Sequence, residues 1–326
     1  MHPRAPAGRP DAGWPHTRPL RLATRGSPLA RRQTDMVAHL LAQGRPGLVI
    51  EPVVVRTEGD RRSEEPLERI GGQGVFVKEI QQAVLDGRAD VAVHSAKDLP
   101  PFVAPGLVLA AVPVRGDARD ALVGSTLAAL GSGARVATGA ARRRAQLANL
   151  RPDLCFVAAR GNIETRLARA NGDGADAVVV AAAALDRLSI TSQAAEILSP
   201  LVMLPQVGQG AIALECAADD EAVRGLLALV DHQDSHRALI AERTMLAAMG
   251  ASCSLPVGGW AEPDGPRLHL RGMVASADGR IQLHADGWGA DPVTLGTEVA
   301  HKLLHDCGAD RLLGQDLGAR RGEPAR

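Results

Sequence analysis

Three side chains capable of acid–base or ion-pair chemistry, His94, Lys97 and Asp98, stand within the five residues His94-Ser95-Ala96-Lys97-Asp98. They follow the apolar run Val91–Val93, which predicts a buried strand with the polar groups at its C-terminal end. Ligands of open α/β sheets bind at that end. A partly desolvated carboxylate there, Asp98, can stabilise a developing cation or transfer a proton. The alternative is a solvated turn with an incidental ion pair, against which the apolar approach of the strand argues.

Arginine is concentrated in the middle of the chain. Residues 135–187 contain nine arginines, five acidic residues and no lysine. Guanidinium groups bind carboxylates or phosphates bidentately, so this composition favours a polyanionic ligand. The chain is rich in Arg throughout, and composition alone is the competing explanation. However, Arg142 and Arg143 follow Thr138-Gly139 at an expected strand-to-helix turn and Arg160 precedes another, and helix N-termini attract anions.

Cys253 lies in a loop rich in Gly, Ser and Pro, residues 250–259, just after an expected helix. Such a thiol can be a nucleophile, an attachment point or an accident, and no nearby His–Asp pairing marks a protease-type nucleophile. Cys155 and Cys216 are flanked by apolar residues and are expected to be buried. Without a CxxC spacing, the four cysteines predict neither a disulfide framework nor a metal site.

Two short glycine motifs, Gly72-Gln73-Gly74 and Gly208-Gln209-Gly210, lack the third glycine of a dinucleotide fingerprint. The sequence also has no GxxxxGK[ST] motif, so we expect no nucleotide cofactor. We expect these glycines to allow close backbone approach to a ligand or to free a hinge.

Short apolar strands alternate with helical patterns, which predicts an α/β fold with largely parallel sheets. The expected strands are Leu20–Thr24, Val53–Arg56, Asp90–His94, Arg135–Thr138, Cys155–Val157, Ala177–Ala181 and Ala211–Glu215, with alternating segments at Leu268–Val274 and Ile281–His284. The expected helices are Pro28–Leu41 (capped by Ser27), Phe76–Leu85, Ala141–Leu150, Ile163–Asn171, two before Met249 and one over Gly296–His305.

Two crossings, the proline-rich Leu99–Val114 and the glycine-bearing Leu204–Gly210, predict two lobes joined by a double hinge. We expect one lobe from residues 20–113 and 211–228, and an arginine-rich second lobe from 114–210. An α+β domain follows at 229–313, with a disordered leader at 1–19 and a loose tail at 314–326.

The overall composition excludes several classes of protein. The 326 residues carry 37 Lys+Arg against 37 Asp+Glu, with 2% aromatic residues and no Tyr. We therefore expect no nucleic-acid partner and no membrane anchor. The N-terminal residues contain no apolar signal region, so a cytoplasmic location is expected.

Eight segments, in order along the chain, make it closely similar to the porphobilinogen deaminase (hydroxymethylbilane synthase) family. They are LATRGSPLA (22–30), TEGD (57–60), GGQGVFVKE (71–79), ADVAVHSAKDLP (89–100), TGAARRRAQL (138–147), RGNIETRL (160–167), LPQVGQGAIALEC (204–216) and GASCSLPVGG (250–259). The resemblance implies two lobes like those of type II periplasmic-binding proteins, with the active site in the cleft, and a third α+β domain carrying a cofactor cysteine.

The resemblance further implies a monomeric transferase of tetrapyrrole and haem biosynthesis that needs neither a metal nor a nucleotide. It would join four porphobilinogen molecules head to tail, release ammonia and give hydroxymethylbilane. The chain would grow on a dipyrromethane cofactor bound by a thioether to Cys253, with Asp98 as the catalytic aspartate. The implied cofactor-binding residues are Lys97, Arg142, Arg143 and Ser27, and the implied substrate- and chain-binding residues are Arg25, Arg160, Arg166, Arg187 and Phe76.

Two departures from the family pattern concern the site. Gly139-Ala140-Ala141 stands where the family commonly has Ser-Ser-Leu, and Gln73 stands where a lysine is common. Loss of the hydroxyl groups would shift cofactor binding towards arginine, backbone N–H groups or water. Two alternatives stay open at this point: a non-enzymatic two-lobed binding protein for a small anion, and a degenerate homologue that binds pyrroles without turnover.

Overall fold

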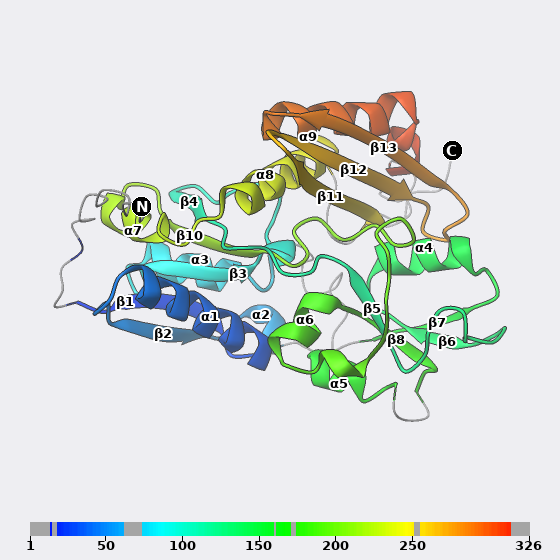
Figure 1. Cartoon of the computed structure of the whole chain (residues 1–326), viewed down its shortest axis with the longest axis horizontal. Coiled ribbons are helices and arrows are strands. Elements are labelled where there is room, and N and C mark those ends of the chain that lie inside the picture. Colours follow the sequence, from blue (N-terminus) through cyan, green and yellow to red (C-terminus); the bar gives the residue numbers. More distant parts are fainter. Residues whose placement is uncertain are drawn as a thin grey trace, which may run out of the picture.

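The computed structural model of the chain describes Trp14 and residues 18–61, 74–159, 161–170, 174–250 and 255–313. The strands of these residues form two five-stranded sheets and one three-stranded sheet. The two larger sheets lie side by side in Figure 1, and the third sheet lies above the second. The α/β class expected from the alternation of strands and helices is confirmed.

The first sheet has the order β2-β1-β3-β10-β4. Its strands are β1 (Leu20–Arg25), β2 (Ile50–Val55), β3 (Val91–Ser95), β4 (Leu107–Ala111) and β10 (Ile212–Ala217). β10 runs antiparallel between β3 and β4, while the other strands share one direction. We call this sheet with α1 (Pro28–Gly44), α2 (Glu58–Arg61), α3 (Lys78–Leu85) and α7 (Glu221–Leu227) the first lobe.

The second sheet repeats this arrangement with the order β7-β6-β8-β5-β9. Its strands are β5 (Asp120–Val123), β6 (Arg135–Ala137), β7 (Cys155–Val157), β8 (Ala177–Ala181) and β9 (Ala194–Ile197). Here β5 is the antiparallel strand. With α4 (Ala141–Leu150), α5 (Ile163–Leu167) and α6 (Ala182–Arg187) it forms the second lobe. In both sheets the antiparallel strand is the one that follows a crossing from the other lobe, which is the type II periplasmic-binding-protein arrangement.

The remaining elements form a third unit. It consists of α8 (Gln233–Ala248), β11 (Val257–Asp264), β12 (Arg267–Ala275), β13 (Gln282–Gly289) and α9 (Pro292–His301), continued by a π-helical turn at Lys302–Asp306. Met245 of α8 packs against the sheet at Gly259 and Gly272. A Cβ at either glycine would lie 2.5 or 2.6 Å from the Met245 side chain. The glycines therefore let the helix approach the sheet closely.

The structure differs from the sequence expectations in several places. The expected crossing Leu99–Val114 contains β4, and the expected loop at 250–259 gives way to β11 at Val257. Cys155 is exposed rather than buried, because β7 is an edge strand paired only with β6. Trp14, in the segment expected to be disordered, is buried in the first-lobe core, and its indole N–H donates to the Arg18 carbonyl. Short strands with little alternation, such as β5 and β9, escape periodicity arguments.

The crossings and the third unit meet at Glu242, a fully buried residue of α8. Its carboxylate accepts from Nη1 of Arg115 at 2.5 Å, from the backbone N–H of Gly208 at 2.7 Å and from that of Ala261 at 2.8 Å. Arg115 lies between β4 and β5, Gly208 between β9 and β10, and Ala261 in β11. One carboxylate therefore joins both crossings to the third unit.

We predict that Glu242→Gln lowers the free energy of unfolding by about 3–5 kcal/mol, because it leaves the Arg115 guanidinium buried without its counter-charge. The midpoint of thermal unfolding measures the loss. Glu262→Gln is the matched control: Glu262 pairs with Arg271 at the surface, with side chains 37% and 31% exposed, and its removal should cost less than about 1 kcal/mol. Equal melting temperatures for the two variants would contradict the role given to Glu242.

Candidate functional site

The sequence-predicted site residues follow the C-terminal ends of parallel strands in both lobes. Arg25 ends β1, and Lys97 and Asp98 form a 3₁₀ turn directly after β3. In the second lobe, the arginines lie in the helices after β6, β7 and β8; they are Arg142, Arg143, Arg166 and Arg187. Because parallel strands end at a common edge, each lobe presents its charged groups along one edge of its sheet, where α/β folds bind ligands.

At the end of β1, the guanidinium of Arg25 is already held by protein groups. It donates to Asp60 at 2.6 Å and 3.1 Å and stacks over the Phe76 ring, with its Cζ 4.0 Å from the ring centroid. Asp60 also accepts from the Thr57 hydroxyl at 2.8 Å. Burial opposes ionisation of Asp60, but the hydrogen bond and charge of Arg25 together with Thr57 hold its pKa below the usual value. The carboxylate thus fixes the direction of the guanidinium.

Gly59 explains why Phe76 can lie there. A Cβ at residue 59 would overlap the Phe76 ring well inside contact distance. The glycine of the TEGD segment is therefore needed for space, beside the aspartate that it precedes. This is a use of that motif that spacing in the sequence does not reveal.

The turn that carries Lys97 and Asp98 rests on the crossing loop. A Cβ at Gly208 would lie 2.9 Å from the Ala96 carbonyl carbon and 3.0 Å from the Lys97 nitrogen, and Gly208 has a φ of +73°. Gln206 donates its side-chain amide to the Lys97 carbonyl at 3.1 Å. The glycine motif expected to allow close backbone approach therefore does so, against this turn of the protein itself.

Lys97 brings together the charged groups of both lobes. Its pKa is lowered to about 8: burial has the largest effect and the positive charges of Arg143 and Arg166 act in the same direction, while Asp98 and Asp120 oppose them. These four groups come from the turn after β3, from α4, from α5 and from β5. Asp98 is partly exposed beside Lys97.

Arg142 and Arg143 are directed into the protein and are 3% and 5% exposed. Both bind the fully buried Asp120, through Nη2 of Arg142 at 2.7 Å and Nη2 of Arg143 at 2.8 Å. Arg142 also donates to the Leu204 carbonyl at 2.6 Å, but its buried Nε has no hydrogen-bond partner among the residues that the structure describes. Burial lowers the pKa of Arg142, although its guanidinium stays protonated in proteins.

Arg187 donates to the Gly210 carbonyl at 2.6 Å, and its own carbonyl accepts from Nε of Arg32 in α1 at 3.1 Å. Burial lowers its pKa to about 10, so the side chain is cationic at pH 7. This arginine therefore links the second lobe to the second crossing and to α1 of the first lobe.

Some predicted residues do not join this arrangement in the structure. The Ser27 hydroxyl caps α1 by accepting from the Ala30 N–H at 3.3 Å. Arg160, Cys253 and Gln73 lie outside the described residues, as does the tail at 314–326. The sequence analysis missed Asp60, Asp120 and Gln209, whose partners are far away in sequence. A signal for Asp120 was available, because a buried arginine pair needs a carboxylate and β5 offers one.

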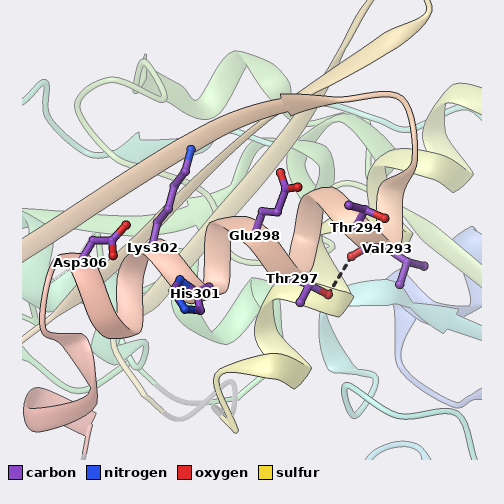
Figure 2. A pocket seen from close by; sticks show the side chains of 7 residues that line it. All are labelled: Val293, Thr294, Thr297, Glu298, His301, Lys302 and Asp306. Carbon is purple, nitrogen blue, oxygen red and sulfur yellow. Dashed lines mark hydrogen bonds between the residues drawn. The ribbon is translucent and has the colours of Figure 1, made fainter.

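A groove of about 600 Å³ runs along the outer side of α9, away from these residues (Figure 2). It is lined by Val293, Thr294, Thr297, Glu298, His301, Lys302 and Asp306. All of them come from one helix and its continuation, and the Thr297 hydroxyl donates a hydrogen bond to the Val293 carbonyl. None is a residue that the sequence predicted for the site, so we assign no role in the reaction to this groove.

Further negative findings concern the part of the chain that the structure describes. No group of three or more His, Cys, Asp or Glu side chains in it could hold a metal ion. None of its helices combines the length and apolar character required to span a bilayer.

Two family models match the chain. Porphobilinogen deaminase, dipyromethane cofactor binding domain, matches residues 20–225, and porphobilinogen deaminase, C-terminal domain, matches residues 236–305. The chain belongs to the porphobilinogen deaminase family. The resemblance inferred from the eight sequence segments is thereby confirmed, and with it the enzyme class, a transferase of tetrapyrrole biosynthesis.

Relatives named porphobilinogen deaminase match most of the chain. The protein of Roseiflexus sp. (strain RS-1) is 47% identical over 299 residues, or 90% of this chain and 99% of the relative. That of Acidithiobacillus ferrooxidans (strain ATCC 53993 / BNL-5-31) is 44% identical over 293 residues, or 89% and 95%. Among solved structures, the Bordetella pertussis BvgS VFT2 domain (double mutant F375E/Q461E) is 21% identical with a TM-score of 0.38, covering 69% of this chain and 91% of that one. The fold assignment stands on the strand order, not on this likeness.

The residues present fit the dipyrromethane group of porphobilinogen deaminases. A ligand that carries carboxylates needs cations and N–H donors. Lys97, Arg142, Arg143 and Asp120 carry a net positive charge, and Nε of Arg142 is buried without a partner. Ala140, where a family hydroxyl is missing, begins α4 without a side-chain cap, which leaves N–H groups at this helix N-terminus for an anion.

We predict that Gly59→Ala lowers the free energy of unfolding by about 1–3 kcal/mol through overpacking against Phe76. The same change in a Phe76→Leu background should cost less by about 0.5–3 kcal/mol, because the ring that clashes is gone. Thermal unfolding of the four proteins completes the cycle. Additive costs would show that the two side chains do not compete for this space.

Proposed function

We propose that this chain joins porphobilinogen units through Asp98, with the arginines of the second lobe and Lys97 binding the carboxylates of cofactor and growing chain. The observation that carries the proposal is that Lys97, in the turn after β3 that also holds Asp98, interacts electrostatically with Arg143 and Arg166 of the other lobe. Porphobilinogen carries acetate and propionate side chains, so each addition increases the negative charge that these cations must balance.

Asp98 is the proposed catalytic residue. Loss of ammonia from porphobilinogen leaves an electron-poor carbon, and a carboxylate held beside it lowers the barrier by stabilising positive charge. The neighbouring Lys97 ammonium offsets the negative charge of Asp98, and so favours the binding of ligand carboxylates nearby. The partly exposed position of Asp98 leaves its oxygens accessible to a ligand.

Arg25 and Phe76 are proposed to face the incoming substrate. The ring offers an apolar face to a pyrrole, and the guanidinium, fixed by Asp60, offers its remaining N–H groups to a carboxylate. Arg187, Arg160 and Ser27 remain proposed binding residues from the family resemblance. Ser27 would bind only through lone pairs or a proton not used in capping α1.

The proposed attachment point of the dipyrromethane is Cys253, as the family resemblance implies. When bound, the cofactor supplies the nucleophilic pyrrole carbon to which the first substrate is joined. We also keep the lobe boundaries given above, 20–113 with 211–228, 114–210 and 229–313, as proposals. We also propose a monomeric cytoplasmic enzyme, as the family resemblance implies, and the balanced net charge supports the absence of a nucleic-acid partner.

Intact-mass spectrometry with an activity assay tests this function. The purified protein should exceed the mass of its polypeptide by two pyrrole units and should consume porphobilinogen. Cys253→Ser should lack the added mass. Asp98→Ala should lower the rate about a thousandfold or more, which corresponds to several kcal/mol in the barrier.

The two alternatives predict other outcomes. A binding protein for a small anion would carry no adduct and consume no porphobilinogen. A degenerate homologue would bind pyrroles without turnover. An unmodified mass in an active protein would overturn the proposed attachment at Cys253.

A pH profile tests the role of Lys97. Because its pKa lies near 8, its ammonium loses its charge as the pH rises above that value, and bound carboxylates can only move this loss to higher pH. We predict that kcat/KM for porphobilinogen falls on the alkaline side, at pH about 8 or above. Lys97→Arg keeps its charge to pH 12 and beyond, so this decline should disappear. An identical decline in Lys97→Arg would assign it to another group.

A further inference from the structure

Asp120 stands at the start of β5, next to the first crossing, and is fully buried. Three side chains donate to its two oxygens: Nη2 of Arg142 at 2.7 Å, Nε of Arg143 at 3.0 Å and Nε2 of Gln209 at 2.9 Å. Gln209, in the second crossing, also donates to the carbonyl of Ala118 at 2.7 Å. Ala118 lies in the first crossing, just before β5, so this hydrogen bond joins the two crossings. The carboxylate therefore stands where both crossings meet the arginine helix.

The charges in this cluster do not balance. Two buried guanidinium groups share one carboxylate, which leaves one net positive charge inside the protein. A buried charge is costly unless it is paired. Asp120 compensates half of the charge, and an anion bound at the site is suited to compensate the remainder. Without Asp120 the two arginines would repel each other in a poorly solvated place.

The orientation of Arg143 depends on the same carboxylate. Nη1 of Arg143 donates to the Val179 carbonyl at 2.9 Å, while Nε and Nη2 are held by Asp120. The guanidinium is thus fixed on two sides. Arg143 and Asp120, together with Asp98 and Arg166, are among the charged groups that act on Lys97.

We propose that Asp120 is a positioning residue of the reaction: it fixes the Arg143 guanidinium and offsets part of the positive charge of the arginine pair, so that this guanidinium is ready for the ligand carboxylates. This inference rests on the proposed function. Asp120 itself is fully buried and its oxygens accept from protein side chains, so it acts through the arginines. Its negative charge acts in two ways, by hydrogen bonds to the guanidinium groups and through space on the ammonium.

Asp120→Asn in the cofactor-loaded enzyme separates these effects from simple stability. The amide keeps the size of the side chain but removes the charge, so Lys97 should lose its proton more easily. We predict that the alkaline decline of kcat/KM moves to lower pH by roughly half a unit or more. At pH 7 the KM for porphobilinogen should rise about tenfold or more, with a smaller change in kcat.

Asp90→Asn is the matched control. Asp90 is also buried and also binds two arginines, Arg18 and Arg21. It lies directly before β3, however, at the opposite end of that strand from Lys97 and Asp98. Both variants should melt at lower temperature than the wild type. Only Asp120→Asn should shift the pH profile and KM, because only Asp120 acts on Lys97 and Arg143.

If Asp120→Asn does not fold, Asp120→Glu serves instead. It keeps the charge, so its alkaline decline should stay at the wild-type position while KM rises because Arg143 is displaced. A wild-type pH profile and KM in Asp120→Asn, or a wild-type KM in Asp120→Glu, would overturn the inference. Absence of porphobilinogen consumption by the wild type would instead overturn the proposed function, so the two failures are distinguishable.

Discussion

The ion pair between Arg115 and Glu242 is the contact on which the relative placement of the three sheets depends. Both crossings between the lobes bond to the same carboxylate, because Glu242 accepts from Arg115 of the first crossing and from the Gly208 N–H of the second. Two residues after Gly208, the Gly210 carbonyl accepts from Gly116 of the first crossing and from Arg187. One buried carboxylate and one backbone carbonyl thus hold the two crossings side by side, next to the turn and helices that carry the site residues.

The site combines this rigid junction with an excess of positive charge. Gln209, between the two glycines, binds Asp120, and Asp120 holds Arg142 and Arg143. The charge that remains lowers the pKa of Lys97 to about 8, together with burial. A protein that binds no anion would gain stability by replacing some of these cations with apolar groups. The buried cations therefore lower the stability of the fold, and a ligand that carries carboxylates would compensate their charge.

The sequence predicted the parts of the site that depend on local pattern. The boundaries of α4, β7 and β8 agree with it to the residue; the fully buried β8 has the clearest apolar pattern of the three. Lys97 and Asp98 were found because they directly follow such a strand. Asp60, Asp120 and Glu242 were not found, since each acts through partners brought close by the fold. A single acidic residue before a short strand carries no periodic signal, and Cys155 was misassigned because edge position is a property of the sheet.

The lobes and the third unit are joined by different kinds of contact, and this bears on how a growing chain is accommodated. Leu239 of α8 packs in one apolar cluster with Ala96 and Ala213 of the first lobe. Met273 and Ala275 of β12 pack with Ala145 of the second lobe. Among the described residues, by contrast, no apolar cluster joins the two five-stranded sheets directly, and α1 reaches α6 through the exposed Arg32. A single hydrogen bond from an exposed arginine contributes little to stability. Each lobe therefore has apolar packing with the third unit, whereas the two lobes are joined to each other mainly by polar contacts and by the crossings that Glu242 holds.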